Sequence, residues 1–370
     1  MGKLHGLCIG LDICSTLHMP ISLDDLNWCA DQILPANPGY LMALPTKNDP
    51  MLSYLTTAFQ DHVRLREKFG YKVNDAMQEF FKKIKIVDGK GKYTEHFGDP
   101  LWVYYQFKVT KGDKRTQKEI YAEGEEAIKR CEDRGVLIAR GHGKELWTLE
   151  PRLEKKIRGF YDDAKICIWD EFSPEFIKTI PHALEVTTNS KNREDFITHP
   201  STGETLNPDS IVTMEKLRDS WGAKIPDVQI VISDGLNSRA IMDDKHLEPY
   251  LTAVRKELTT AGLTVSDSNI VVKSGRVRAG YAIGNILFGK ADPMQPKIIL
   301  HIIGERPGTE HRNYSVYLAG PKAGVWAAKK VDHDIATVIS GISDTAYSPL
   351  EAVKDTIKMV NGFIHAAKKM

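Results

Sequence analysis

The sequence lacks a long hydrophobic run and an excess of either charge. No stretch approaches the roughly 18 consecutive apolar residues that a membrane-spanning helix needs. Its 50 basic and 49 acidic residues leave a formal net charge of +1, with the histidines counted as neutral. A chain this close to neutrality has no general electrostatic attraction for nucleic acid or an anionic membrane. We therefore expect neither as a partner.

Cysteine is scarce as well. Five cysteines occur, all in the first half of the chain, and no two have the spacing CxxC. They are Cys8, Cys14, Cys29, Cys131 and Cys167. This pattern disfavours a disulfide framework and a structural zinc site, so we expect reduced thiols and a cytoplasmic protein. The start, "MGKLHGLCIGLDIC", has neither an uninterrupted apolar region nor a cleavage site, and we expect it to be structural.

Several signatures of common enzyme chemistry are missing. No G-x-G-x-x-G follows a strand pattern, "GHGKEL" fails at its last position, and no Walker-type phosphate loop occurs. The twelve histidines form no HExxH motif or other paired metal spacing. Ser233 lies in "ISDGL", which is not the nucleophile elbow G-x-S-x-G. Nucleotide-dependent, metal-dependent and hydrolase chemistry all lack support in the sequence.

The first seventy residues alternate between strand and helix patterns. "GLCIGLDIC" predicts a buried strand, and Ser22 precedes "LDDLNWCADQIL", which is typical of a capped amphipathic helix. Residues 35–39 break this helix, "YLMALP" predicts a second strand, and "MLSYLTTAFQDHVRLREKFG" predicts a helix ending at Gly70. Parallel strands joined by helices fit this order. Two strands do not make a stable parallel sheet, so we expect the remainder from elsewhere, another chain included.

A charge-rich segment follows. "QKEIYAEGEEAIKRCEDRG" predicts a helix, and "VLIARGHGKELWTL" suggests a hairpin. A helix followed by a hairpin is also the pattern of a winged DNA-binding helix, but acidic residues balance the basic ones here. We expect an α+β connector that packs against its neighbours.

From residue 183 onward the strands and helices of one α/β domain follow each other. Strand patterns are "DVQIVIS", "NIVVK", "KIILHII", "RNYSVYLAG" and "ATVISGIS", with "SGRVRAG" expected as a loop. Helix patterns are "NPDSIVTMEKLRDSW", opened by Asn207 or Asp209, then "EPYLTAVRKELTTAG", "YAIGNILFG" and a last helix from "SPLEAVKDTIKMVNGF". The seven-residue apolar run 298–304 is typical of a strand buried on both faces.

Three of these strands end in polar, turn-forming residues. The ends are residues 233–235, 274–277 and 304–308, the last reading "GERPG". Ligands of open α/β sheets bind beyond the carboxyl ends of the strands, so three converging ends favour a ligand site over three ordinary turns. Asp12 also lies near the carboxyl end of an apolar strand, where barrel enzymes place functional groups. A carboxylate there needs a partner, which an ammonium-bearing substrate, a structural Arg or backbone amides would each supply.

The C-terminal motifs resemble a known family. "PDVQIVISDGLNSRA", "SGRVRAGYAIGNILFG", "IILHIIGERPG" and "ATVISGIS", in this order, are similar to the small subunit of ethanolamine ammonia-lyase. "ALEVTTNSKNREDFITHPSTGETL" resembles the segment before them in that subunit. "GLDICSTLH" and "YLMALPTKNDPMLSYLTTAFQDH" resemble the C-terminal end of the large subunit of the same enzyme. The chain thus resembles a large-subunit tail fused to a small subunit.

The resemblance implies a fold and a domain division. Residues 1–93 would be the C-terminal remnant of the large-subunit (β/α) barrel, and residues 94–182 the α+β connector. Residues 183–370 would be a doubly wound α/β domain of the small-subunit type that binds cobalamin.

The implied activity is the adenosylcobalamin-dependent conversion of ethanolamine to acetaldehyde and ammonia by a radical mechanism. Homolysis of the cobalt–carbon bond would give a deoxyadenosyl radical that abstracts a substrate hydrogen, while the protein orients the substrate and shields the radicals. In the family the corrinoid lies between the two subunits. A D-x-H-x-x-G motif would indicate a histidine as lower axial ligand, but the nearest match here, 244–249, ends in Pro249. Base-on cobalamin binding is therefore expected.

The resemblance assigns site residues by position. Met51, Val277 and Glu305 match positions that contact cobalamin. Val338 stands where the family has Cys, so a backbone contact would survive the change and a thiol contact would not. Asp12 matches the carboxylate that holds the substrate ammonium, and Met42 lies near the substrate pocket. The resemblance marks no other catalytic residue and no metal ligand in this chain.

This chain departs from the family in a way that affects its expected activity. The remaining substrate ligands belong to barrel strands that this chain lacks, so we expect a partner chain that carries the rest of the barrel, in an oligomer. The alternatives are a non-catalytic corrinoid-binding or assembly protein that kept the small-subunit domain, and an α/β enzyme of unrelated chemistry. Location inside a bacterial microcompartment stays open beside the cytoplasm.

Overall fold

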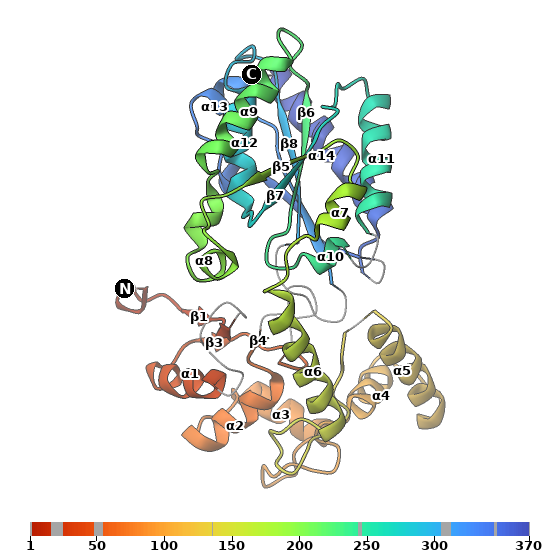
Figure 1. Ribbon diagram of the computed structural model, residues 1–370. Helices are drawn as coiled ribbons and strands as arrows, with labels where there is room; N and C mark the ends of the chain where they lie inside the picture. Colours follow the sequence, from red (N-terminus) through yellow and green to blue (C-terminus); the bar gives the residue numbers. More distant parts are fainter. Residues whose placement is uncertain are drawn as a thin grey trace. The chain divides into compact units, whose positions relative to one another are not determined.

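The computed structural model describes residues 2–15, 25–47, 55–134, 136–242, 246–304, 312–343 and 346–369. The chain divides into two compact units, Met1–Asp162 and Asp163–Met370 (Figure 1). The three-part division at residues 93 and 182 stays a prediction.

The C-terminal unit is built on one six-stranded sheet in the order β10-β9-β8-β6-β7-β5. Neighbours are parallel from β8 to β5, whereas β9 is antiparallel to both β8 and β10. The strands are β5 (Ala183–Thr187), β6 (Val228–Ser233), β7 (Asn269–Lys273), β8 (Ile298–Ile303), β9 (Tyr314–Ala319) and β10 (Thr337–Ile342). This mixed sheet with helices around it confirms the predicted α/β class.

Helices cover both faces of this sheet (Figure 1). One face packs against α9 (Pro208–Ser220), α12 (Val277–Phe288) and α13 (Ala323–Ala327). The other packs against α7 (Pro174–Thr179), α10 (Arg239–Met242), α11 (Leu247–Thr260) and α14 (Pro349–Lys369). Every residue of β6 and β8 is buried, and their side chains alternate between the two cores. The predicted two-sided burial of 298–303 is confirmed, because a central strand between two helical layers needs apolar residues on both faces.

Helix starts in this unit follow local chemistry. The side chain of Asn207 accepts a hydrogen bond from the Ser210 N–H at 2.8 Å and so caps α9, which settles the choice between Asn207 and Asp209. The segment "SGRVRAG" was expected as a loop, but α12 already begins at Val277. The short elements α8 (Arg193–Thr198), η3 (Pro200–Glu204) and η4 (His333–Ile335) complete the unit.

The N-terminal unit holds two short strand pairs. β1 (Gly10–Leu11) pairs in parallel with β3 (Tyr40–Leu41), and β2 (Cys14–Ser15) pairs antiparallel with β4 (Leu55–Thr56). The expectation of one continuous buried strand over "GLCIGLDIC" is wrong, since Leu7 is 60% exposed and only Ile13 is buried. Within the part of this unit that the structure describes, each of these strands has a single neighbour, which does not hold a long strand in place. The second predicted strand is confirmed at β3.

Helices make up most of the rest of this unit. They are η1 (Gly2–His5), α1 (Asp25–Ile33), η2 (Leu34–Ala36), α2 (Phe59–Phe69), α3 (Asp75–Lys83), α4 (Pro100–Thr110), α5 (Gln117–Glu132) and α6 (Pro151–Cys167), which runs past the unit boundary. The break after α1 and the end of α2 at Gly70, where φ is +68°, are confirmed, but α2 begins at Phe59 because β4 precedes it. Ser22, the expected cap upstream of α1, lies outside the described residues.

The charged segment between the two predicted domains differs from its expectation in part. Helix α5 is confirmed, with Thr116 and Glu119 forming a capping box. The expected hairpin over 136–149 is wrong, because that segment contains no strand. Gly141, with φ at +125°, and a turn closed from the Gly143 N–H to the Thr148 carbonyl replace the ladder. The connector is therefore helical rather than α+β over its described residues.

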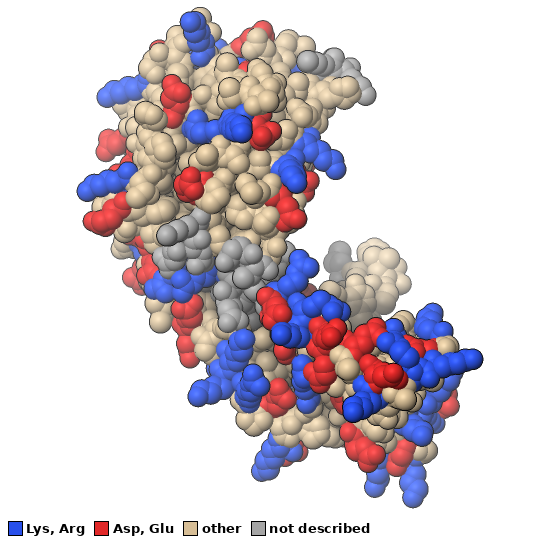
Figure 2. Space-filling model, turned by 90° about the vertical axis from the view of Figure 1, so that its right-hand side faces the viewer, with Lys and Arg blue, Asp and Glu red and all other residues tan. Residues whose placement is uncertain are grey.

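The distribution of surface charge and the hydropathy of the described helices agree with the composition. On the face shown in Figure 2, basic and acidic side chains of described residues intermingle. None of the described helices is long and apolar enough to cross a membrane.

Candidate functional site at the carboxyl edge of the sheet

The parallel strands β5, β6, β7 and β8 end at the same edge of the sheet, and polar residues from their ends meet there. The Asp234 carboxylate, directly after β6, accepts hydrogen bonds from the N–H groups of Ser274 and Gly275 after β7, both at 3.1 Å. The Asn237 N–H donates to the Gly304 carbonyl after β8 at 2.8 Å. The expected convergence of three strand ends is confirmed up to Gly304, while Glu305 and residues 306–308 lie outside the described residues.

Asp234 is a buried acidic residue at this edge and forms an ion pair there. Arg193, from α8, places its Nη1 3.3 Å from Asp234 Oδ2, and the two side chains are 8% and 0% exposed. Burial raises the pKa of Asp234 to about 6, against the opposing effects of Arg193 and of the Ser274 and Gly275 N–H groups. Arg193 Nε also donates to the Ile168 carbonyl at 2.7 Å. One buried ion pair thus ties α8 to β6 and, through the two amides, to the turn before α12.

The turn into α12 is held in a strained conformation. Ser274 has φ at +53°, in the left-handed region that non-glycine residues rarely adopt. Gly275 has no room for a side chain, since a Cβ there would lie 2.5 Å from Ser233 Oγ. Strain that the surroundings enforce is common at functional sites, and this turn leads directly into Val277, the first residue of α12.

Aromatic stacking supports the same turn from the α8 side. The guanidinium carbons of Arg193 and Arg276 lie 4.8 and 4.5 Å from the centroid of the Phe196 ring. Arg276 also donates from Nη2 to the Phe196 carbonyl at 3.1 Å, and its N–H donates to the Gly203 carbonyl at 2.8 Å. Sequence reasoning missed Arg193 and Phe196, because no motif signals a pair formed with a residue 41 positions away.

A buried Ser233–His301 pair lies beneath this edge. Ser233 Oγ and His301 Nε2 are 2.6 Å apart, and both residues are 0% exposed. Helix α12 crosses so close that a Cβ at Gly280 would lie 2.5 Å from His301 Nδ1. Burial lowers the pKa of His301 to about 4, although a hydrogen bond with the Val277 backbone opposes the shift. Enclosed in this way, the pair serves packing rather than nucleophilic catalysis.

This burial predicts a pH dependence of stability. The imidazole titrates near pH 6.5 when unfolded and about 4 when folded, so the folded state binds fewer protons between these values. The contribution of His301 to the free energy of unfolding is complete above pH 6.5. It falls as the pH drops toward 4, by about 3 kcal/mol in total. The unfolding free energy of the wild type minus that of His301→Gln, measured in urea from pH 7 to pH 4, should decrease by this amount. A difference that stays constant over this range contradicts the assignment.

Val338 lies on the same side of the sheet as α12. In β10 it pairs with Tyr317 of β9, which pairs with His301 of β8. Directly paired residues point to one face, and His301 faces Gly280 of α12. Val338 is 44% exposed on this edge strand, whereas Val277 is 9% exposed. The two valines therefore share one face of the sheet, one of them open to solvent.

The N-terminal unit brings together two of the residues predicted there. Asp12 directly follows β1 and Met42 directly follows β3, and the Met42 N–H donates to the Leu11 carbonyl at 2.9 Å. Asp12 is exposed, and its Oδ1 accepts a hydrogen bond from Thr56 Oγ1 at 2.6 Å. Met42 is 53% exposed. Met51 lies outside the described residues.

Comparison with known proteins decides the family. Residues 133–368 match the family model described as ethanolamine ammonia-lyase light chain. The chain belongs to this family. Residues 1–96 match a second family model, ethanolamine ammonia lyase large subunit, so the chain is an ethanolamine ammonia-lyase fusion.

A curated relative agrees with the light-chain match. The ethanolamine ammonia-lyase small subunit of Clostridium perfringens is 29% identical over 199 residues, which are 53% of this chain and 60% of that subunit. The alignment thus covers less than two thirds of the relative. Val277, Glu305 and Val338 fall in the light-chain match, and Asp12 and Met51 fall in the large-subunit match. Residues 97–132 lie between the two matched ranges.

Proposed function

We propose that the chain is part of an adenosylcobalamin-dependent ethanolamine ammonia-lyase, which releases acetaldehyde and ammonia, and that it works with a partner chain carrying the rest of the barrel. The observation that carries this proposal is the joining of a large-subunit match and a light-chain match in one polypeptide. The partner is needed because Asp12 alone of the expected substrate ligands is present. The assembly is an oligomer in the cytoplasm, with a bacterial microcompartment as the alternative location.

The architecture supports the finer fold assignment. Helices on both faces of a largely parallel sheet suit a doubly wound small-subunit domain, residues 183–370. In the N-terminal unit, β1, α1 and β3 form a parallel strand–helix–strand unit, which is the repeating element of a (β/α) barrel. We assign residues 1–93 as a barrel remnant on this basis.

The carboxyl edge of the C-terminal sheet suits a large, flat ligand with amide side chains. Val338 offers an exposed apolar surface, and α12 begins at Val277 on the same side of the sheet. The first N–H groups of a helix have no intrahelical acceptor and donate readily to amide oxygens. Val277, Val338 and Glu305 would contact the corrinoid. Met51 stays a proposed cobalamin contact by its position in the family. The bound cofactor supplies radical initiation, and the protein supplies orientation and exclusion of water.

Asp12 has the geometry of a substrate ligand. Its carboxylate is exposed at the end of β1, so a substrate ammonium can reach it, while Thr56 Oγ1 fixes one oxygen. Thr56 Oγ1 lies 3.1 Å from the Ile13 carbonyl as well, which holds the hydroxyl in place. In the complete enzyme Asp12 would bind the ammonium and stabilise it as nitrogen migrates.

Corrinoid titration tests the proposal on this chain. We expect saturable binding of hydroxocobalamin or adenosylcobalamin, followed by the corrin absorption, when a large subunit that lacks its own tail is present. Glu305→Ala and Val338→Glu should each raise the Kd at least about tenfold, a loss of about 1.4 kcal/mol. Glu257→Ala, exposed on α11, and Val212→Glu, 46% exposed on α9, are matched controls and should bind as the wild type does.

Two other results discriminate among the hypotheses. No saturable binding up to about 1 mM, the weak end of specific affinity, contradicts the corrinoid site. Binding with the expected variant effects, but no ammonia release from ethanolamine, favours the non-catalytic corrinoid-binding or assembly protein.

A further inference from the structure

A cavity of about 540 Å³ lies within the N-terminal unit, between α2, the start of α4 and the loop 138–146. This size is ordinary for small-molecule sites, which span about 300–1,000 Å³. One wall is a single stripe of α2, namely Phe59, His62, Val63 and Arg66, at helical spacing. The opposite wall comes in part from residues 97–103, which lie between the two matched family ranges.

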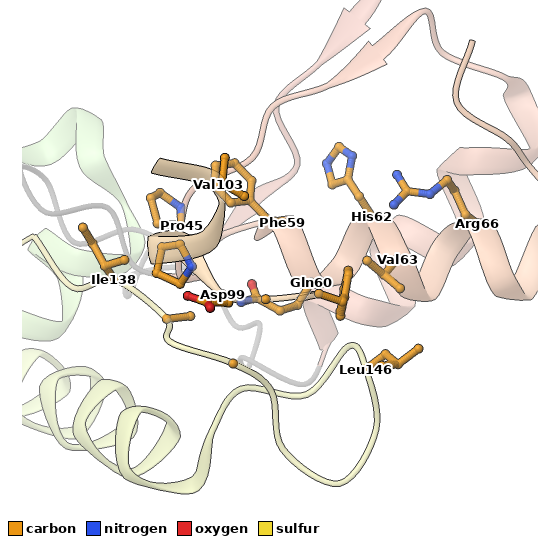
Figure 3. Close-up of a pocket in the computed structure, with 15 residues that line it drawn as sticks. Pro45, Phe59, Gln60, His62, Val63, Arg66, Asp99, Val103, Ile138 and Leu146 are labelled. Carbon is orange, nitrogen blue, oxygen red and sulfur yellow. The ribbon is translucent and has the colours of Figure 1, made fainter. Parts of the chain in front are cut away.

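The lining is mostly apolar, with one basic residue, Arg66, and one acidic residue, Asp99. Phe59, Val63, Val103, Ile138 and Leu146 supply most of the apolar surface. In Figure 3, His62 and Arg66 lie next to each other on one side of the cavity, with Asp99 and Ile138 toward the other. Arg66 forms no ion pair with any residue that the structure describes. A guanidinium without a counter-ion beside an apolar cavity favours an anionic ligand.

His62 lies on the same wall as Arg66, and its pKa is lowered. Burial is the largest cause that lowers its pKa, the adjacent Arg66 lowers it further, and a hydrogen bond with the Met42 backbone opposes the shift. Its Nε2 and the Oε1 of Gln60 are buried without a hydrogen-bond partner among the described residues. Both atoms have almost no accessible surface, so they do not determine which ligand the cavity prefers.

Asp99, the acidic residue of the lining, does not reverse the preference of the cavity for an anionic ligand. Asp99 caps α4, and its Oδ1 accepts hydrogen bonds from the N–H groups of Leu101 and Trp102 at 2.8 and 3.2 Å. Its Oδ2 faces the Tyr121 hydroxyl at 3.5 Å. Arg66 would repel an ammonium ligand, and the Asp99 carboxylate already accepts hydrogen bonds from the protein. The cavity is therefore unsuited to the amine substrate of the proposed reaction.

We propose that this cavity is a second, non-catalytic site that binds a small apolar monocarboxylate, with Arg66 pairing the carboxylate. Asp12 and Met42 are not among its lining residues, although His62 interacts with the Met42 backbone. The inference does not depend on corrinoid binding.

Titration calorimetry on the full chain with three probes of one size tests this site. We expect 3-(4-hydroxyphenyl)propionate to bind at least about tenfold more tightly than its uncharged amide or tyramine, which carries a positive charge. Arg66→Gln should remove this preference, whereas Lys83→Gln, an exposed lysine on α3, should leave it unchanged. Val103→Trp, at a wall residue that is 42% exposed, should block all three probes.

Four results would overturn the proposal. Equal binding of the carboxylate and the amine removes the charge argument, as does a carboxylate affinity that Arg66→Gln leaves unaltered. Absence of binding by all three probes removes the site. Self-association in sedimentation runs that Val103→Trp abolishes would show that a second copy of this chain fills the cavity instead.

Discussion

Arg193→Ala is expected to destabilise the C-terminal unit by about 3–5 kcal/mol, because it leaves the buried Asp234 carboxylate without its counter-ion. Asp234 is 0% exposed, and among the described residues the Ser274 and Gly275 N–H groups remain as its donors. The pKa of Asp234 should rise further above its value of about 6, so the loss should be largest above that pH. Urea denaturation, with the strand amides of β6 to β8 followed by hydrogen exchange, measures the effect on this unit.

A matched substitution separates this pair from surface electrostatics. Arg278, on α12, is 44% exposed and forms ion pairs with Glu204 and Asp332. Exposed pairs of this kind contribute about 0–1 kcal/mol, so Arg278→Ala should cost at most that. If Arg193→Ala costs no more than Arg278→Ala, the buried pair does not hold the carboxyl edge together.

The second large effect is expected at Asp12. In the assembly with its partner chain, Asp12→Ala should lower kcat/KM for ethanolamine by about 10²–10³-fold, because truncating one side of a desolvated charge pair costs about 2–5 kcal/mol. Asp12→Asn should lose nearly as much, since an amide bonds to ammonium without attracting its charge. The measurement is steady-state ammonia release, with the corrinoid Kd followed in parallel.

Two control measurements accompany this prediction. Corrinoid affinity should stay within about twofold of the wild type in both variants, because Asp12 is assigned to the substrate. Asp75→Ala, at the start of α3, changes an exposed aspartate of the same unit and should keep full activity. Full activity in Asp12→Ala would contradict the role of this carboxylate.

The sequence predicts the C-terminal sheet well and the N-terminal strands poorly, for one physical reason. Runs such as 298–303 carry apolar residues toward two helical layers, and a short run that is apolar on both faces is typical of a central strand. The segment Gly10–Ser15 also carries apolar residues, Leu11 and Ile13, yet among the described residues each of its strands has one neighbour and stays short. The number of neighbouring strands depends on the whole fold and leaves no signal in the local sequence.

The candidate site shows the same limit. Turn residues after β6, β7 and β8 predict a ligand site at this edge, because parallel strands bring their ends together. Nothing local couples Arg193 to Asp234 or sets the strained φ of Ser274, since both depend on packing between distant segments. The expected hairpin over 136–149 failed because its glycines favour turns over a ladder.

The most direct test of the account is ammonia and acetaldehyde release by the reconstituted enzyme. The chain would be mixed with a large subunit that lacks its own tail, then supplied with adenosylcobalamin and ethanolamine. The account predicts turnover only when both polypeptides, the cofactor and the substrate are present. Turnover by this chain alone, or without adenosylcobalamin, would contradict it, as would no turnover in the complete mixture after corrinoid binding has been shown.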